Sequence, residues 1–485
     1  MTKPPQLENL TESLQNHLGI EQAQTFAPED IIADAISRLT GTRGDVGRLR
    51  QLWQPDAGPA LVDGWRPADH GEALVQLRRV LDANLVVQRG RDGVPKTFRP
   101  LMPEMVNADK PSTLYRDLGR TVSDVLWRGD ELRASLRSRV DSWKSRHPLA
   151  LALASLCAPK PLERSTTTTS RLGQLLARGE DPGLAEWVRG VVAEDWRTWL
   201  DASETLSIDE QIETMTALAC LHLHVALLWR LWGQGERAIV FVAVAGQDME
   251  RACAKAAYNM YGFWGERSYD GLRLMAKRAV DKARASQPGW YQLATDRDLA
   301  AWAVVGIDRG RSANTRFQQR IKETQHIAHE SLEGALIDAL VDAFSTDSGV
   351  ATKVKDYLRG TGRAVGLIGP DTYRARKRYQ IDERAISLLA RMHFHRLRDD
   401  IRSREDERYG VDALLDDVFH RYGLVVTRER GPIREAFHAP STRAIVGRFP
   451  SDEAMRRNRA NLERRLDELR LVRRYSDASA VLHVV

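Results

Sequence analysis

Four cations stand close together at residues 372–379, and their chemistry suits the binding of a polyanion. The stretch reads TYRARKRY, and its cations are Arg374, Arg376, Lys377 and Arg378. Guanidinium and ammonium groups pair with backbone phosphates, and tyrosine rings offer faces for stacking on bases. Residues 351–410 hold 15 Lys or Arg and 9 Asp or Glu, an excess of six that equals the net charge of the whole chain. This stretch predicts a nucleic-acid contact, with an ordinary solvated basic loop as the alternative.

A second group of arginines lies in residues 451–485. Guanidinium groups fork onto phosphates and guanine edges, so these side chains are further candidates for DNA contact. The candidates are Arg456, Arg457, Arg459, Arg464, Arg473 and Arg474. The same segment has eight Arg against six Asp or Glu, and Arg–Glu pairs one turn apart are common on solvated helix faces. We therefore expect the segment to bind DNA only together with the basic stretch before it, as one composite surface.

Carboxylates follow an apolar run in the middle of the chain. Asp248 and Glu250 come directly after AIVFVAVAG at 238–246, and Lys255 follows them. Acidic side chains at the end of a buried strand stand where α/β proteins place ligands, and a metal-dependent nuclease would need such residues. Only one strand of this strength is evident, and capping of the next helix by Asp248 is the plainer interpretation. A nuclease centred on residues 238–255 is kept as an alternative.

Other patterns that could carry chemistry are incomplete. The CLHLH stretch at 220–224 would gather its ligands on one side of a strand, but on a helix they diverge, so it indicates core residues. His393-x-x-Arg396 followed by Tyr422 is similar to the motif of tyrosine recombinases, but the tyrosine is misplaced relative to that family's pattern. The dipeptide Gly-Lys occurs nowhere, which excludes a P-loop NTPase. We predict no catalytic residue, no metal and no cofactor.

The elements that would position these residues are mainly helices. Ser207 and Glu210 form a capping box that opens an apolar helix over 208–232. This helix approaches the length of a membrane span but contains two histidines and an arginine, so it is interpreted as a buried core helix. The run at 238–246 predicts a strand buried on both faces, followed by a helix over 249–261. Asp92-Gly93 between two β-prone runs predicts a hairpin.

The order of elements near the C-terminus resembles a winged helix-turn-helix. We predict a helix over 382–403, a helix over 411–422 capped by Gly423, and a strand over 424–429. A third helix then opens at Ser451 or Asp452, and a terminal hairpin follows from 471 to 485. The resemblance is to an architecture that serves many functions. In such modules the third helix enters the major groove.

Length and composition indicate a multi-domain globular protein. The chain has 485 residues, 42% of them hydrophobic and 28% charged, and its three cysteines are far apart, which fits a reducing cytoplasm. We expect a mainly α (α+β) fold: a multi-domain helical protein with a small central β/α element and a C-terminal winged-helix-like domain. The expected divisions are a loose N-terminal segment at 1–30, an α+β domain with a helix-hairpin unit at 31–158, a linker at 159–170, a central helical domain with one buried strand at 171–350, and a basic loop plus winged-helix-like domain at 351–485.

The function expected from these features is association with duplex DNA. We expect a non-enzymatic bacterial protein of the cytoplasm that binds DNA through the C-terminal winged helix and the adjacent basic loop. An accessory subunit of a multi-protein DNA-processing or anti-phage defence system fits best, with protein partners or homo-oligomers and no membrane. The alternatives are the nuclease above and a scaffold whose winged helix mediates protein–protein contacts.

Overall fold

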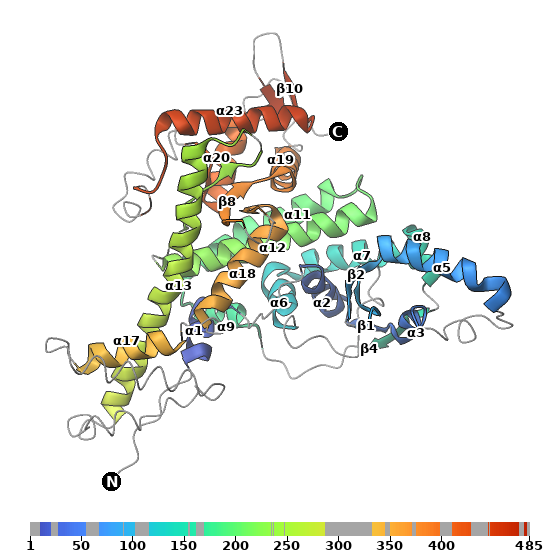
Figure 1. Ribbon diagram of the computed structural model, residues 1–485, viewed down its shortest axis with the longest axis horizontal. Coiled ribbons are helices and arrows are strands. Elements are labelled where there is room, and N and C mark those ends of the chain that lie inside the picture. Colours follow the sequence, from blue (N-terminus) through green and yellow to red (C-terminus); the bar gives the residue numbers. More distant parts are fainter. Residues whose placement is uncertain are drawn as a thin grey trace.

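The computed structural model of the chain is mainly helical, as the sequence predicts (Figure 1). It describes residues 10–20, 28–54, 67–90, 92–101, 116–153, 156–161, 169–233, 235, 237–246, 248–286, 332–344, 350–370, 375–397, 410–427, 445, 447–474 and 480–482. A long helix runs along one side of the molecule, a bundle of helices crosses from it to the N-terminal elements, and a C-terminal helix lies across its first turns.

The N-terminal part combines helices with two small antiparallel pairs of strands. Its elements are α1 (Leu10–Leu18), α2 (Pro28–Thr40), β1 (Thr42–Asp45), α3 (Gly47–Gln51), α5 (Pro67–Asn84), β2 (Val86–Arg89), β3 (Pro95–Phe98), α6 (Arg116–Thr121), the π-helical turn η2 (Val122–Leu126), α7 (Asp130–Arg146), α8 (Pro148–Leu153) and β4 (Ala158–Pro161). Strands β2 and β3 form the predicted hairpin, and Asp92 Oδ1 accepts the N–H of Val94 at 3.1 Å in its turn. Strand β1 pairs with β4.

Two segments that the sequence analysis took as loose are ordered in part. Residues 10–18 of the expected loose segment form α1, whose Leu10, Leu14 and Leu18 are buried in the core. Three leucines at i, i+4 and i+8 make a narrow apolar stripe, which suffices for a short helix with packing partners. The expected linker begins at 159, but residues 159–161 belong to β4. Its residues 162–168 lie outside the described part of the chain.

Helix α12 (Ile208–Trp232) is the central element of the core. The predicted capping box is present, since Ser207 Oγ accepts the N–H of Glu210 and the Glu210 carboxylate accepts the N–H of Ser207. Gly233 ends the helix at φ +68°, a left-handed conformation that suits glycine. By length and composition α12 could cross a membrane, but 83% of its most apolar window is buried inside the protein, as in the core helix of a soluble protein.

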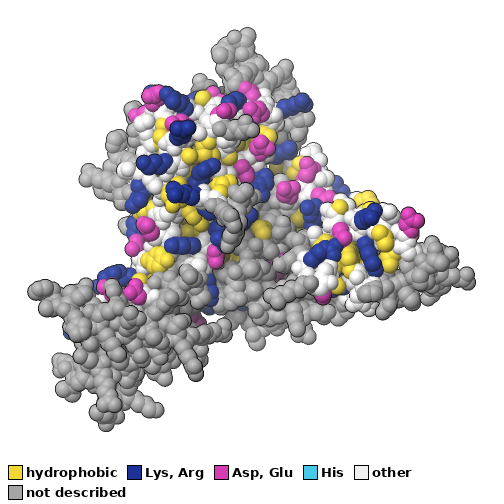
Figure 2. Space-filling model, in the orientation of Figure 1, with side chains coloured by type: hydrophobic (Ala, Val, Ile, Leu, Met, Phe, Trp, Pro, Cys, Tyr) yellow, Lys and Arg dark blue, Asp and Glu magenta, His cyan; other side chains and the backbone are white. Residues whose placement is uncertain are grey.

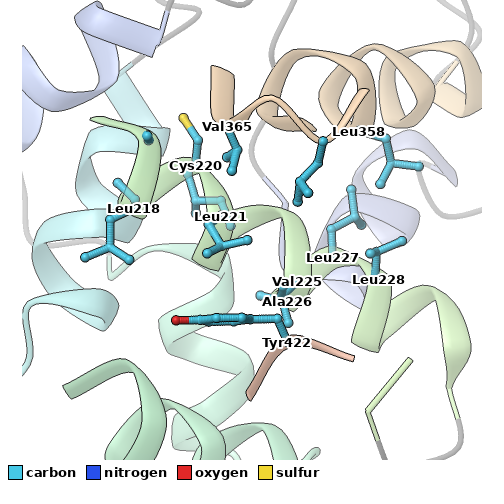
Figure 3. Close-up of a cluster of buried hydrophobic side chains, with 14 of the residues drawn as sticks. Leu218, Cys220, Leu221, Val225, Ala226, Leu227, Leu228, Leu358, Val365 and Tyr422 are labelled. Atoms are coloured by element: carbon cyan, nitrogen blue, oxygen red, sulfur yellow. The ribbon is translucent and has the colours of Figure 1, made fainter. Parts of the chain in front are cut away.

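Helices surround α12 on all sides, which explains why it is apolar all round. Before it come α9 (Arg171–Ala177), α10 (Pro182–Trp187), the π-helical turn η4 (Val188–Val192) and α11 (Ala193–Ala202), and after it come α13 (Arg251–Ser286), α17 (Leu332–Phe344) and α18 (Val350–Val365). Figure 3 shows apolar side chains of α12 between Leu358 and Val365 of α18 on one side and Tyr422 on the other.

The predicted central strand is present and buried, but it is not alone. It comprises β5 (Val240–Phe241) and β6 (Ala243–Val244). Strand β5 pairs in parallel with β9 (Leu424–Val425), and β6 pairs in parallel with β8 (Arg378–Ile381), which pairs in turn with β7 (Ile368–Gly369). The partners come from residues 351–485, so the central strand joins the two parts of the chain that the sequence analysis divided at 350.

A basic loop was expected at the start of the division 351–485, but residues 350–365 form helix α18. Gly362 of this helix serves packing. A Cβ on Gly362 would lie 2.5 Å from Ile368 Cδ1 of β7 and 3.2 Å from His224 Cε1 of α12, so a larger residue would force these neighbours away from α18. Among the described residues, those between β7 and β8 that belong to no helix or strand are 370 and 375–377, and residues 371–374 lie outside the described part of the chain.

The C-terminal elements are α19 (Glu383–Leu397), α20 (Val411–Tyr422), β9, α23 (Asp452–Glu468), β10 (Val472–Arg474) and β11 (Ala480–Leu482). The helix over 411–422, its left-handed cap at Gly423 (φ +71°), the Ser451 N-cap of α23 and the terminal hairpin β10–β11 are confirmed. Helix α19 ends at Leu397, and residues 398–409 lie outside the described part. Strand β9 pairs with β5, not with the terminal hairpin.

Candidate nucleic-acid interface

The arginines of α23 form ion pairs with neighbouring carboxylates. Arg457 pairs with Glu453 one turn away, and Arg459 pairs with Asp412 of α20 at 2.9 Å. Helix α23 contains five arginines and five Asp or Glu, so its own charge is balanced. Arg456, another predicted contact, is exposed on this helix. Because its net charge is zero, α23 by itself offers a phosphate backbone little electrostatic attraction.

The C-terminal part of α23 forms ion pairs with residues that follow the carboxyl ends of the parallel strands. Arg464 pairs with Asp248 at 2.8 Å, and Arg465 pairs with Glu383, which follows β8, at 3.6 Å. The guanidinium of Arg465 lies against Gly246, where a Cβ would be 2.3 Å from Nη2. DNA contact was predicted for Arg464 from the sequence, and it stays a prediction. In the structure the half-exposed guanidinium pairs with Asp248, and an exposed pair of this kind contributes little to stability.

Asn458 fastens the buried face of α23 to two strands. Its Nδ2 donates to the carbonyls of Val242 and Val426, each at 3.0 Å, and its Oδ1 accepts the N–H of Val244 at 2.8 Å. The side chain is fully buried, so all of these bonds are shielded from water. No sequence pattern pointed to Asn458, because its partners are more than 30 residues away.

The predicted basic cluster is only partly described. Arg376 is exposed, and its guanidinium lies 5.7 Å from the ring centroid of Tyr258 on α13. Lys377 Nζ donates to the carbonyl of Pro370, and Arg378 is half-buried in β8. Arg374 and the side chains of Arg473 and Arg474 lie outside the described residues. Of Arg376, Lys377 and Arg378, Arg376 is therefore the side chain most accessible to a ligand.

The largest excess of positive charge lies on α13 and α18, which pack against each other. Helix α13 contains eight Lys or Arg against three Asp or Glu, and α18 contains four against one, a combined excess of eight. Figure 2 shows Lys and Arg side chains repeating down the part of the molecule that α13 occupies. We call the exposed cations on one side of α13, together with Arg376, the basic ridge; they are Arg251, Lys255, Arg273, Lys277, Arg284 and Arg376.

Tyrosines lie beside cations along this ridge. Lys355 Nζ of α18 lies 4.5 Å from the ring centroid of Tyr269 and 3.3 Å from its hydroxyl, and Arg376 lies over Tyr258. The stem of Lys355 also covers Gly265, where a Cβ would be 3.1 Å from Cε. Cations and aromatic rings thus alternate on one surface. The two members of each pair are about 90 to 120 residues apart in sequence.

A buried ion network links the C-terminal helices to the core. The carboxylate of Asp195 on α11 is fully buried and accepts hydrogen bonds from His222 Nε2 (2.9 Å), Tyr422 Oη (2.8 Å), Arg396 Nη1 (3.0 Å) and Arg421 Nη2 (2.7 Å). Burial alone would raise the pKa of Asp195, but the hydrogen bond and charge of His222, with Arg421 and Arg396, hold this pKa below its ordinary value.

The network continues outward from Asp195. Asp417 of α20 binds Arg396 and lies 3.1 Å from His393 Nδ1, and Glu194 pairs with Arg421 at 2.9 Å. It therefore joins α11, α12, α19 and α20. A buried carboxylate of this kind is stable only when each charge has a partner, and here both arginines have two.

The residues that are similar to the tyrosine recombinase motif are members of this network. His393, Arg396 and Tyr422 do converge in space, but Tyr422 is 1% exposed and its hydroxyl donates to Asp195. Burial, followed by the charge of Asp195, raises the pKa of this phenol well above its ordinary value. A protonated, inaccessible phenol is no nucleophile, so these residues have a structural role.

The carboxylates after the central strand are separated from one another. Glu250 caps α13 by accepting the N–H of Cys253 at 2.8 Å, so the expected capping by Asp248 is wrong. Asp248 pairs with Arg464 instead. Within the described ranges, no three His, Cys, Asp or Glu side chains are placed to share a metal ion. His222 and His224 diverge on α12, as predicted, and His224 Nδ1 lies 2.9 Å from Thr361 Oγ1 of α18.

Comparison with protein-family models, with curated proteins and with solved structures gives no match to this chain.

Proposed function

We propose that the protein binds DNA through its phosphate backbone and that the basic ridge is the main contact surface. The observation that carries this proposal is the charge of α13 and α18. Their excess of eight exceeds the net charge of +6 for the whole chain, so the rest of the chain carries a slight negative excess. Concentrated positive charge on one surface attracts a polyanion far more strongly than the same charge spread over the molecule.

The ridge can bind phosphates because some of its cations form no ion pair with a carboxylate of the described residues. Among the described residues, Arg251, Lys255 and Lys277 are exposed and form no ion pair. The arginines of α23 differ, because carboxylates such as Asp248 and Asp412 lie beside them. Neutralising a phosphate with a free cation releases counterions, whereas a cation that is already paired must first give up its partner.

The C-terminal elements are proposed to contribute as a winged-helix-like module beside the ridge. The order of α19, α20, β9, α23 and the hairpin β10–β11 supports this proposal. The pairing of β9 with β5 ties the module to the body, so it would act as part of one surface. The proposed role is that of a non-enzymatic subunit of a larger DNA-processing or anti-phage defence assembly in the bacterial cytoplasm.

The test is salt-dependent binding of the full chain to a labelled DNA duplex, measured by fluorescence anisotropy. Affinity should fall steeply between about 50 and 200 mM salt, with a log–log slope of about −0.9 for each phosphate contact. The triple variant Arg251→Glu, Lys255→Glu, Lys277→Glu should bind at least about 10-fold more weakly and show a slope shallower by about two to three.

A matched control reverses three exposed arginines outside α13, Arg137, Arg189 and Arg197, and changes the net charge equally. This control should lower affinity by less than about threefold, because charges farther away than about 10 Å are screened. Equal losses in both triple variants would reject the ridge as the contact surface. Binding that does not respond to salt, or the absence of binding, would reject the DNA-binding proposal and favour a purely protein-binding scaffold.

A further inference from the structure

An exposed aromatic ring stands on the basic ridge. Tyr258 is 42% exposed and is the only aromatic among the exposed large hydrophobic side chains of the described residues. Phenol rings are amphipathic, but leaving this much ring surface in water gives up burial that a core position would provide. Arg376 lies over this ring, so the aromatic surface and a cation are offered together.

The helix surface next to this ring is open. Gly262 follows Tyr258 by four residues, on the same side of α13, and a Cβ at this position would have no atom within 4 Å. Tyr269 lies three turns along the same side, with Lys355 beside its ring. Glycine costs about 1 kcal/mol relative to alanine inside a helix, so a bare backbone here is an unfavourable choice for the fold alone.

Cations continue this line in both directions. Arg251 and Lys255 precede Tyr258 by seven and three residues, and Arg273 follows Tyr269 by four, so all lie on the same side of α13. Arg273 is paired with Asp338 at 2.8 Å, so Arg251 and Lys255 are the cations of this line that form no ion pair among the described residues. The distance from Tyr258 to Tyr269 is about 16 Å along the helix axis, the length of about five stacked nucleotides of one strand. One exposed acidic side chain, Glu266, lies on the same side, four residues after Gly262 and three before Tyr269.

We propose that this side of α13 binds an unpaired strand of nucleic acid, with a base stacked on Tyr258 and the phosphates on the flanking cations. The inference rests on the proposed DNA binding and names the form of nucleic acid that the ridge prefers. An exposed ring can stack only on a base whose face is free, and in a duplex the base faces are already stacked. Rings and cations alternating along a backbone track are typical of single-strand binding surfaces.

The experiment compares a labelled oligo-dT with a duplex of the same length, using the full chain. Tyr258→Ala should weaken binding of the single strand by about 5- to 100-fold, the effect of losing one base–aromatic stack, and change duplex affinity by less than about twofold. Tyr258→Phe keeps the ring and should bind the single strand like the unmodified protein. Leu274→Ala removes another exposed side chain of α13, on a different side, and should change neither affinity.

Two results would overturn the inference while the proposed function stands. One is an equal effect of Tyr258→Ala on single strand and duplex, and the other is a Tyr258→Phe variant as weak as Tyr258→Ala. If neither probe shows salt-dependent binding to the unmodified protein, both proposals fall together. Thermal unfolding of each variant checks its folding, and the half-exposed position of Tyr258 predicts only a small change in Tm.

Discussion

Replacing Asp195 by Asn should destabilise the protein strongly, because this carboxylate neutralises the centre of the buried ion network. The amide has nearly the same shape but carries no charge, and it would direct donors toward groups that are themselves donors. Removing one partner of a buried ion pair costs about 3–5 kcal/mol. Arg396 would retain Asp417 and Arg421 would retain Glu194, so we expect a loss near the lower end, about 3 kcal/mol.

The loss can be measured by denaturant unfolding at neutral pH. A matched control is Asp201→Asn, which changes an exposed carboxylate on the same helix and should cost less than about 0.5 kcal/mol. Tyr422→Phe removes one neutral donor to Asp195 and should cost about 1 kcal/mol. The two changes share a hydrogen bond, so the double variant should lose less than the sum of the single losses.

The effect of Asp195→Asn should also depend on pH in a defined direction. The folded-state pKa of Asp195 is lowered, so its stabilisation is fully present above the unfolded-state pKa of about 3.9 and is lost as the pH falls through the folded-state value. The difference between the two proteins should stay constant from neutral pH to about pH 5 and shrink below about pH 4. A loss no larger than that of Asp201→Asn would refute the view that this network stabilises the fold.

Two further substitutions test how the central strand is enclosed. Asn458→Ala should lower the free energy of unfolding by about 2–3 kcal/mol, because it leaves polar groups at β6 and β9 without partners. It should also speed hydrogen exchange of the backbone amides in α23. Unchanged exchange would contradict this role of Asn458. Gly423→Ala should cost more than about 2 kcal/mol in denaturant unfolding, since φ is +71° and a Cβ would lie 1.9 Å from the carbonyl oxygen of Ala238. The control Gly190→Ala has open space and no left-handed φ, and it should be neutral or slightly stabilising.

Sequence patterns located helix ends well, because their signals are local. Ser207, Gly423 and Ser451 each act on backbone groups within four residues, so the residue type alone indicates the conformation. The hairpin β2–β3 was predictable for the same reason, since its turn occupies adjacent positions. Helix α18 was not predicted, because glycine also marks loops. Gly362 fits this helix because Ile368 and His224 pack closely against it, and the sequence does not place these residues beside it.

The pairing of the basic residues could not be predicted from the sequence. The sequence identified basic residues by type, but an arginine contacting phosphate and an arginine paired with a carboxylate look alike in sequence. Arg464 pairs with Asp248, which lies 216 residues earlier, and no local spacing indicates that pair. The proposed basic ridge could not be located from the sequence for a similar reason, because the sequence does not show that α18 and Arg376 lie beside α13.

The sequence by itself determined that the chain is mainly helical, where α12 and α20 begin and end, where α23 begins, and that the run at 238–246 is a buried strand. These properties depend on residues within about one turn of each other, so composition and spacing suffice. Only the tertiary structure decided which charges are neutralised: Asp195 gathers His222, Arg396 and Arg421, while Arg251 and Lys255 remain exposed. Electrostatic energy depends on distance through space and on burial, and neither quantity follows from separation along the chain.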